Sequence, residues 1–149
     1  MTNGPYHYKE SGLDTVYLLN GYEIVDTSGG KGVNIQDVEG LHDAIGRTII
    51  EITKKLSGQE FRFLRTELLM SQAVLAKLLH VKELTVARWE KGQTKIPLSA
   101  DATIRILYQE KIGGNRKLSE LLQSIADIED FIDRKIIMED TAEGWDRAA

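Results

Sequence analysis

Apolar side chains return every three or four residues through the middle of the chain, in short runs separated by polar breaks. This is the period of helices with one buried face, and it predicts four of them between residues 58 and 111. They begin near Gly58, Ser71, Lys82 and Ser99. Ser71 suits a helix N-cap, and Gly92 suits the position after a helix C-terminus because it accepts a positive φ. Helices this short are marginal alone, so we expect them to pack around one core.

The expected core consists of the residues on the inner faces of these helices. Trp89 is assigned to it, rather than to a ligand site, because the helical period places it beside Val86. Pro97 breaks the chain before the fourth helix. The predicted inward-facing residues are Phe61, Leu64, Leu68, Leu75, Ala76, Leu79, Val81, Val86, Trp89, Ile104, Leu107 and Tyr108.

The N-terminal side of the chain predicts a β-hairpin followed by a helix. Asn20-Gly21 separates two β-prone runs, a strong signal for a type I′ turn between strands at about 15–19 and 22–26. After the loop SGGKG, residues 33–35 offer a third strand. Asp37 then suits the N-cap of a helix over 37–57. Its apolar residues recur at intervals of four and three: Leu41, Ile45, Ile49, Ile52 and Leu56.

The C-terminal side predicts one amphipathic helix over 113–138 and a frayed tail over 139–149. The helix either folds back on its own domain or pairs with a second copy. Its apolar stripe comprises Leu118, Leu121, Leu122, Ile125, Ile128, Ile132 and Ile136.

Charge is divided unevenly along the chain, whose net charge is -4. Residues 1–53 hold three Lys/Arg against eight Asp/Glu, residues 54–117 hold thirteen against six, and residues 118–149 hold three against nine. The segments therefore carry -5, +7 and -6, which sum to -4. A basic middle between acidic flanks is the asymmetry expected when one module binds a polyanion and the others serve another purpose.

Several classes of protein are not indicated. The chain has no cysteine, which excludes disulfides, thiolate nucleophiles and cysteine-based zinc sites. His7, His42 and His80 show no metal-ligand spacing, so we expect no metal and no other cofactor. There is no long apolar run and no signal peptide at the start, which favours a cytoplasmic protein without a membrane anchor. No catalytic set stands out, and SGGKG lacks the spacing of a phosphate-binding loop and is read as a turn.

The pattern SQxxLAxxLxVxxxTVxRWEKG resembles the helix-turn-helix of the Xre family, the DNA-binding domain of phage repressors, over about residues 58–112. Ala76 is small where the two helices of the motif cross, while Val86 and Trp89 anchor the second helix to the core. The implied fold is mainly α, a repressor-like helix-turn-helix bundle with a small N-terminal β-hairpin region (1–36), a connecting helix (37–57) and a C-terminal amphipathic helix. The residues in register are Ser71, Gln72, Leu75, Ala76, Val81, Val86, Trp89, Glu90 and Gly92.

The resemblance implies two sets of DNA contacts. Its recognition-helix positions, expected at base edges, are Lys82, Glu83, Leu84, Thr85 and Arg88. Arg88 is the strongest of them, because a guanidinium can bind guanine O6 and N7 together. Glu90 is expected to make a structural bond rather than to touch DNA, whose charge would repel it. The residues expected at phosphates are Arg62, Arg65, Ser71, Gln72, Lys91 and Lys95.

Two positions depart from the family pattern. His80 stands where the turn usually has glycine, so we expect it to adopt the left-handed conformation at some cost. Lys82 stands where a serine or threonine usually caps the recognition helix, which costs on the order of 1 kcal/mol. Neither position belongs to the core pattern.

The sequence thus predicts a transcriptional regulator, a homodimeric repressor of its own promoter that binds double-stranded DNA at an inverted repeat. Dimerisation is favoured because two copies can read half-sites about one DNA turn apart. The alternative is an antitoxin, because a β-containing N-terminal region joined by a helix to a Xre-type domain is similar to the arrangement of MqsA-type antitoxins. The zinc-binding cysteines of that family are absent, so this would be a zinc-free antitoxin that binds a toxin and represses its own operon.

Overall fold

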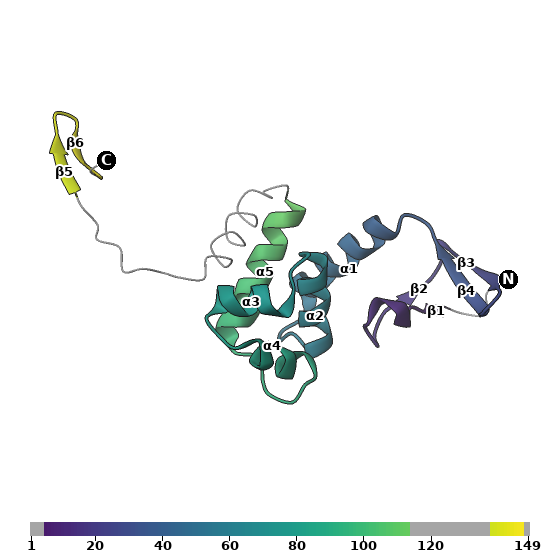
Figure 1. Ribbon diagram of the computed structural model, residues 1–149. Helices are drawn as coiled ribbons and strands as arrows, with labels where there is room; N and C mark the ends of the chain where they lie inside the picture. The colour runs from purple at the N-terminus through teal and green to yellow at the C-terminus, as the bar shows by residue number, and fades with distance from the viewer. Residues whose placement is uncertain (1–4, 114–137, 148–149) are drawn as a thin grey trace.

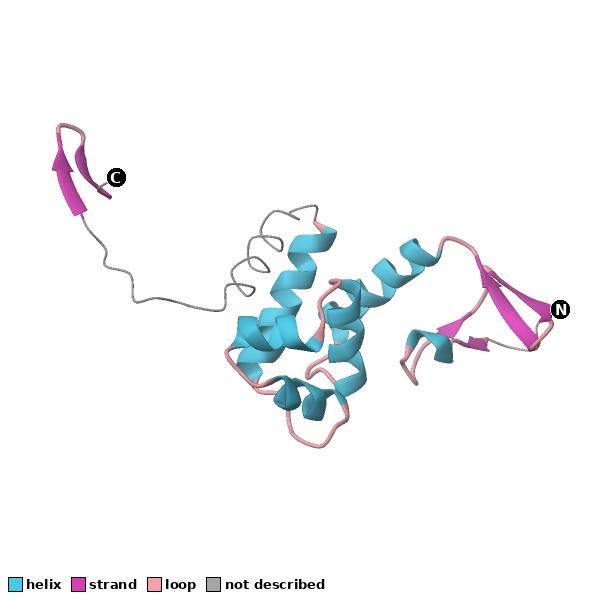
Figure 2. Cartoon of the chain, in the orientation of Figure 1, coloured by secondary structure: helices cyan, strands magenta, loops and turns pink. Residues whose placement is uncertain are grey.

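The computed structural model describes residues 5–113 and 138–147 (Figure 1). Helices dominate the described residues, with short antiparallel strands towards both ends of the chain (Figure 2), so the predicted mainly-α class is confirmed. The helices are α1 (Val38–Ile52), α2 (Gly58–Glu67), α3 (Gln72–Leu79), α4 (Glu83–Glu90) and α5 (Leu98–Ile112). The strands are β1 (Tyr6–His7), β2 (Tyr17–Leu18), β3 (Tyr22–Thr27), β4 (Gly30–Ile35), β5 (Met138–Thr141) and β6 (Gly144–Arg147).

Local capping sets where the central helices begin and end. The Ser57 hydroxyl and the Glu60 carboxylate each bind the other's backbone N–H, a capping box that starts α2. Ser71 caps α3 as predicted, its Oγ accepting from the Val74 N–H at 3.1 Å. Gly92 follows α4 with φ +73°, also as predicted. The fourth helix begins at Leu98, one residue before the predicted start, because Pro97 occupies the N-cap and proline is tolerated at a helix N-terminus.

The predicted core is confirmed. Ten of the twelve expected residues are buried, and Leu79 and Val81 are partly buried against the same cluster. The Trp89 indole meets the edge of Phe61, with ring centroids 5.7 Å apart at 83°. Tyr108 lies against Gly46 of α1, where an added Cβ would sit 2.1 Å from the phenol oxygen. Burial raises the pKa of Tyr108 to about 12, so its hydroxyl stays protonated.

The connecting helix is shorter than predicted. Asp37 caps α1 by accepting from the Gly40 N–H, and Ile45 and Ile49 are buried as expected. The helix ends at Ile52, which is exposed, and Leu56 is buried after the helix rather than within it.

The reason for the early end of α1 comes from α5. The Arg105 guanidinium donates to the carbonyls of Ile50 and Thr53, at 3.2 and 2.8 Å. Asp101 accepts from the Leu56 N–H at 2.9 Å. Side chains of α5 thereby satisfy backbone groups that would otherwise need another helical turn.

The N-terminal hairpin forms between different strands from those predicted. β3 pairs with β4, placing Thr27 opposite Gly30, while β2 pairs with β1. The prediction of a hairpin turning at Asn20-Gly21 was therefore wrong. A type I′ turn needs positive φ at both central residues, and here only Gly21 has it. Of the loop SGGKG, only Ser28 and Gly29 form the turn, and the stretch 33–35 belongs to β4.

Residues before β3 share the core of the helical bundle. Tyr8, Leu13 and Leu18 are buried in the same cluster as the residues of α2 to α5. The Gln59 side chain accepts from the Asp14 N–H at 3.1 Å and donates to the Asp14 carboxylate at 2.9 Å. These contacts join the N-terminal segment to the start of α2.

The C-terminal region differs from the predicted structure in the part that the structure describes, residues 138–147. The helix predicted over 113–138 lies almost entirely outside the described residues. Residues 138–147 form a β5–β6 hairpin, not the expected tail. The turn explains it, because the Thr141 hydroxyl donates to the Gly144 carbonyl at 2.6 Å and Gly144 has φ +113°. No helix in the described ranges is long and apolar enough to cross a bilayer.

Candidate nucleic-acid interface

Two helices, α3 and α4, form the core of the candidate site and are joined by a tight turn. His80 takes the left-handed conformation at φ 56° and ψ 43°, as predicted for a residue in place of glycine. Its N–H donates to the Lys77 carbonyl at 3.2 Å, and the Val81 N–H donates to the Ala76 carbonyl at 3.0 Å. These bonds satisfy the last carbonyls of α3 and turn the chain directly into α4.

The inner face of α4 is fixed in the core, which leaves its other face in solvent. Val86 and Trp89 are buried, and Lys82 at the N-cap makes no side-chain capping bond. The predicted base-contacting residues lie on the outer side: Lys82, Glu83, Leu84 and Arg88 are exposed, and Thr85 is partly exposed. Leu84 keeps 57% of its surface accessible, so an apolar side chain is available on this face of the helix.

Four of the six predicted phosphate-contacting residues are exposed: Arg62, Ser71, Lys91 and Lys95. The Ser71 oxygen accepts the capping bond of α3, and its hydroxyl proton remains able to donate. None of the three ion pairs among the described residues includes Lys82, Arg88, Lys91 or Lys95. The exposed side of α4 and the segment after it therefore present cations that are not neutralised within the described part of the chain.

Arg65 does not join this set, because its guanidinium is used inside the domain. It binds the Glu90 carboxylate through two nitrogens, at 2.7 and 3.0 Å, and the Met70 carbonyl at 2.9 Å. The two side chains are only 12% and 3% exposed. Arg65 was expected at a phosphate, but its long side chain reaches α4 and pairs with Glu90 instead. Glu90 makes the structural bond expected of it.

Gln72 is divided between the two roles. Its side-chain amide donates to Glu90 Oε1 at 2.9 Å, which joins the start of α3 to the end of α4. An amide nitrogen carries two protons, so one donor remains for another acceptor. We name Arg65, Gln72 and Glu90 the Glu90 network. The sequence predicted a structural bond for Glu90 but not that Arg65 and Gln72 would be its partners.

The histidines have local partners. His42 lies between the Tyr8 hydroxyl at 2.8 Å and the Glu67 carboxylate at 3.1 Å, and His7 stacks on Tyr17. Across the described ranges, no three His, Asp or Glu side chains gather as metal ligands.

Part of the chain matches a known protein family. Residues 61–100 match the family model described as helix-turn-helix. Searches of the curated proteins and of the solved structures found no match. The matched stretch runs from the first turn of α2 to the start of α5 and includes both helices of the motif and the turn between them.

Proposed function

We propose that this chain, whose residues 61–100 form a DNA-binding helix-turn-helix of the Xre/Cro type, is a homodimeric transcriptional repressor that binds an inverted repeat. The observation that carries the proposal is the outer face of α4, which bears uncompensated cations while its inner face is held in the core. A helix anchored in this way can enter the major groove, which is about as wide as one helix. The proposal includes a cytoplasmic location and assigns no catalytic role and no cofactor.

The residues of the site divide by chemistry. Arg88 reads guanine through two donors, Thr85 bonds to a base or phosphate, and Leu84 lies against a thymine methyl group. Lys82 and Glu83 complete the reading face, Glu83 by accepting from a cytosine amine. The phosphate contacts, which position the protein without specifying sequence, come from Arg62, Ser71, Gln72, Lys91 and Lys95.

The experiment that tests this function is a selection of bound duplexes from random DNA, followed by a salt titration on the selected sequence. We expect one enriched sequence with two-fold symmetry. We also expect log Kd to rise linearly with log salt, with a slope near 0.9 for each phosphate contact. No enriched sequence together with a flat salt dependence would contradict DNA binding.

The proposed dimer has a candidate surface on α5. Ala102, Ile106, Gln109 and Gly113 are exposed at helical spacing, and none of them is charged. Ile106 leaves 56% of its surface in solvent. Two copies paired through this stripe would bury it, and a two-fold dimer can read two half-sites about one DNA turn apart.

Replacing Ile106 with glutamate should give a monomer, because a two-fold axis would bring two buried carboxylates together. Sedimentation velocity measures the change, and affinity for the two-fold symmetric duplex should fall with it. Ile24→Glu, at another exposed isoleucine, is the matched control and should remain dimeric. If Ile24→Glu dissociated the dimer and Ile106→Glu did not, α5 would not be the interface.

One observation supports the second function, a zinc-free antitoxin that also represses its own operon. Among the described residues β3 and β4 pair only with each other, so both outer edges of this two-stranded ribbon are open. Open edges with an exposed apolar residue, here Ile24, are suited to adding a strand from a partner. The distinguishing observation is whether a neighbouring reading frame encodes a small growth-inhibiting protein that copurifies with this chain.

A further inference from the structure

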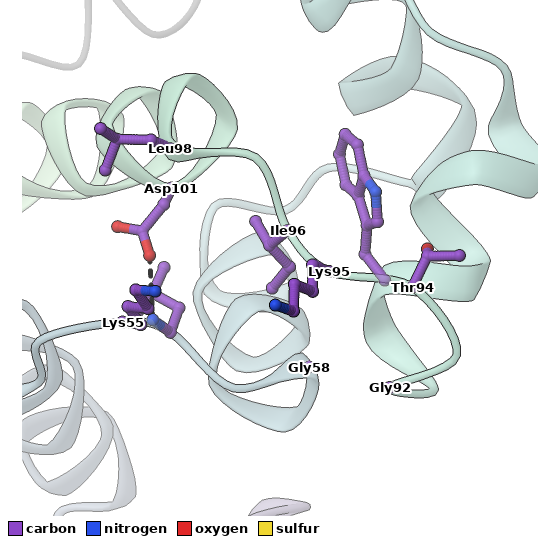
Figure 3. A pocket seen from close by; sticks show the side chains of 10 residues that line it. Lys55, Gly58, Gly92, Thr94, Lys95, Ile96, Leu98 and Asp101 are labelled. Atoms are coloured by element: carbon purple, nitrogen blue, oxygen red, sulfur yellow. Dashed lines mark hydrogen bonds between the residues drawn. The ribbon is translucent and has the colours of Figure 1, made fainter.

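A groove of about 410 Å³ lies between the start of α2, the end of α4 and the segment that leads into α5 (Figure 3). We call it the α4–α5 groove. Its apolar walls include Trp89, Ile96 and Leu98, and Leu98 leaves 80% of its surface in solvent. An exposed leucine beside a buried tryptophan makes an apolar surface, and covering such a surface lowers the free energy of the protein.

The groove carries net positive charge. Lys55 and Lys95 line it and form no ion pair with any described residue. The acid among the lining residues, Asp101, is already used: one oxygen accepts from the Leu56 N–H at 2.9 Å and the other from Arg105 at 2.6 Å. A group that fits the groove must therefore combine an apolar or aromatic part with negative charge.

The β5–β6 hairpin of this chain has that composition. Trp145 is 72% exposed, Asp140 lies opposite it, and Asp146 follows it. Residues 138–147 hold four Asp/Glu against one Arg, or -3. A hairpin of only two strands is marginal in water, and burial of its exposed tryptophan would stabilise it.

We propose that the β5–β6 hairpin docks in the α4–α5 groove of its own chain. The Trp145 indole lies against Ile96 and Leu98, and the carboxylate of Asp140, which is paired with Trp145 and shares its face of the hairpin, lies towards Lys55 and Lys95. The chain allows it, because residues 114–137 can span at most about 80 Å. Since both parts belong to one chain, docking is a unimolecular step, so weak contacts suffice.

Docking has a regulatory consequence that rests on the proposed function. Lys95 borders the groove and is one of the proposed phosphate contacts, so the acidic hairpin and DNA compete for the same cation. Docking lowers the apparent affinity of the protein for DNA. The measured affinity is the affinity of the undocked form multiplied by the fraction of molecules in which the groove is free.

Docking is tested without DNA by the two-dimensional NMR spectrum of the full chain. The chain has two tryptophans, so two indole N–H signals are expected, and Trp145→Phe identifies one of them. We expect the Trp145 signal to lie away from the position of an unstructured tryptophan and to move towards it in Leu98→Ser and in Lys55→Gln/Lys95→Gln. Leu69→Ser and Lys54→Gln, at exposed positions outside the groove, are the matched controls and should leave it in place.

A Trp145 signal at the unstructured position, or one that the groove variants do not move, overturns the docking. A signal that shifts with protein concentration assigns it to a second copy and overturns the intramolecular form. If the docked form makes up about nine-tenths of the molecules, Trp145→Ala tightens DNA binding about tenfold. Unchanged DNA affinity beside a positive docking signal overturns only the competition. A chain that binds no DNA but shows the signal contradicts the proposed function alone.

Discussion

Replacing Glu90 with alanine should lower the free energy of unfolding by about 3 to 5 kcal/mol, because it leaves the charge of a nearly buried arginine without a partner. The Arg65 guanidinium would keep only the Met70 carbonyl. Gln72 would also lose its acceptor, so the contact between the start of α3 and the end of α4 would weaken. Urea unfolding followed by circular dichroism measures the loss.

Two variants control for other causes of that loss. Glu83→Ala removes an exposed carboxylate from the same helix and should change stability by less than about 1 kcal/mol. The double variant Arg65→Met/Glu90→Leu removes both charges and should be more stable than Glu90→Ala, since an apolar pair leaves no buried charge. A Glu90→Ala protein as stable as Glu83→Ala would show that the Glu90 network does not hold the domain together.

Replacing Arg88 with alanine should remove about 1 to 3 kcal/mol of base discrimination. Affinity for the selected duplex should fall roughly 5- to 150-fold, while affinity for a random duplex should change little. Competition binding with the two duplexes at one salt concentration measures the ratio. The expected result follows from the position of Arg88, exposed on α4 and in no ion pair among the described residues.

Lys91→Ala is the matched control, a cation one residue past the end of α4. It should weaken binding to both duplexes to the same extent and reduce the slope of log Kd against log salt by the amount of about one phosphate contact. If Arg88→Ala also weakened binding to both duplexes equally, Arg88 would be a phosphate contact, and base reading would belong to the first turn of α4.

The helices of the DNA-binding domain could be predicted because their signals are local. Ser71 and Gly92 act on their own helix ends, and the spacing of apolar residues decides which face of each helix is buried. The outer positions of α4 follow from the same period. For this reason the exposed face of α4 was predictable residue by residue, with Lys82, Leu84 and Arg88 all exposed as expected.

The errors have two physical causes: the two hairpins form at local turns that the prediction passed over, and elsewhere distant residues decide the outcome. The turn at Thr27–Gly30 pairs β3 with β4 and leaves Asn20-Gly21 outside the hairpin turn. The end of α1 depends on Arg105, more than fifty positions along the chain. Arg65 looks like a surface cation by its spacing, and only the path of α4 brings Glu90 within reach.

The bond between Arg105 and the end of α1 also bears on how the protein responds to load. One guanidinium joins the last carbonyls of α1 to α5, and Asp101 fastens the segment that follows. The joint at this end of α1 is therefore braced, while the far end leads to the β3–β4 ribbon (Figure 1). The helix is about 22 Å long by its 15 residues, and Ile45, Gly46 and Ile49 are buried along its middle. Any displacement of α1 would therefore also strain its contacts with α5.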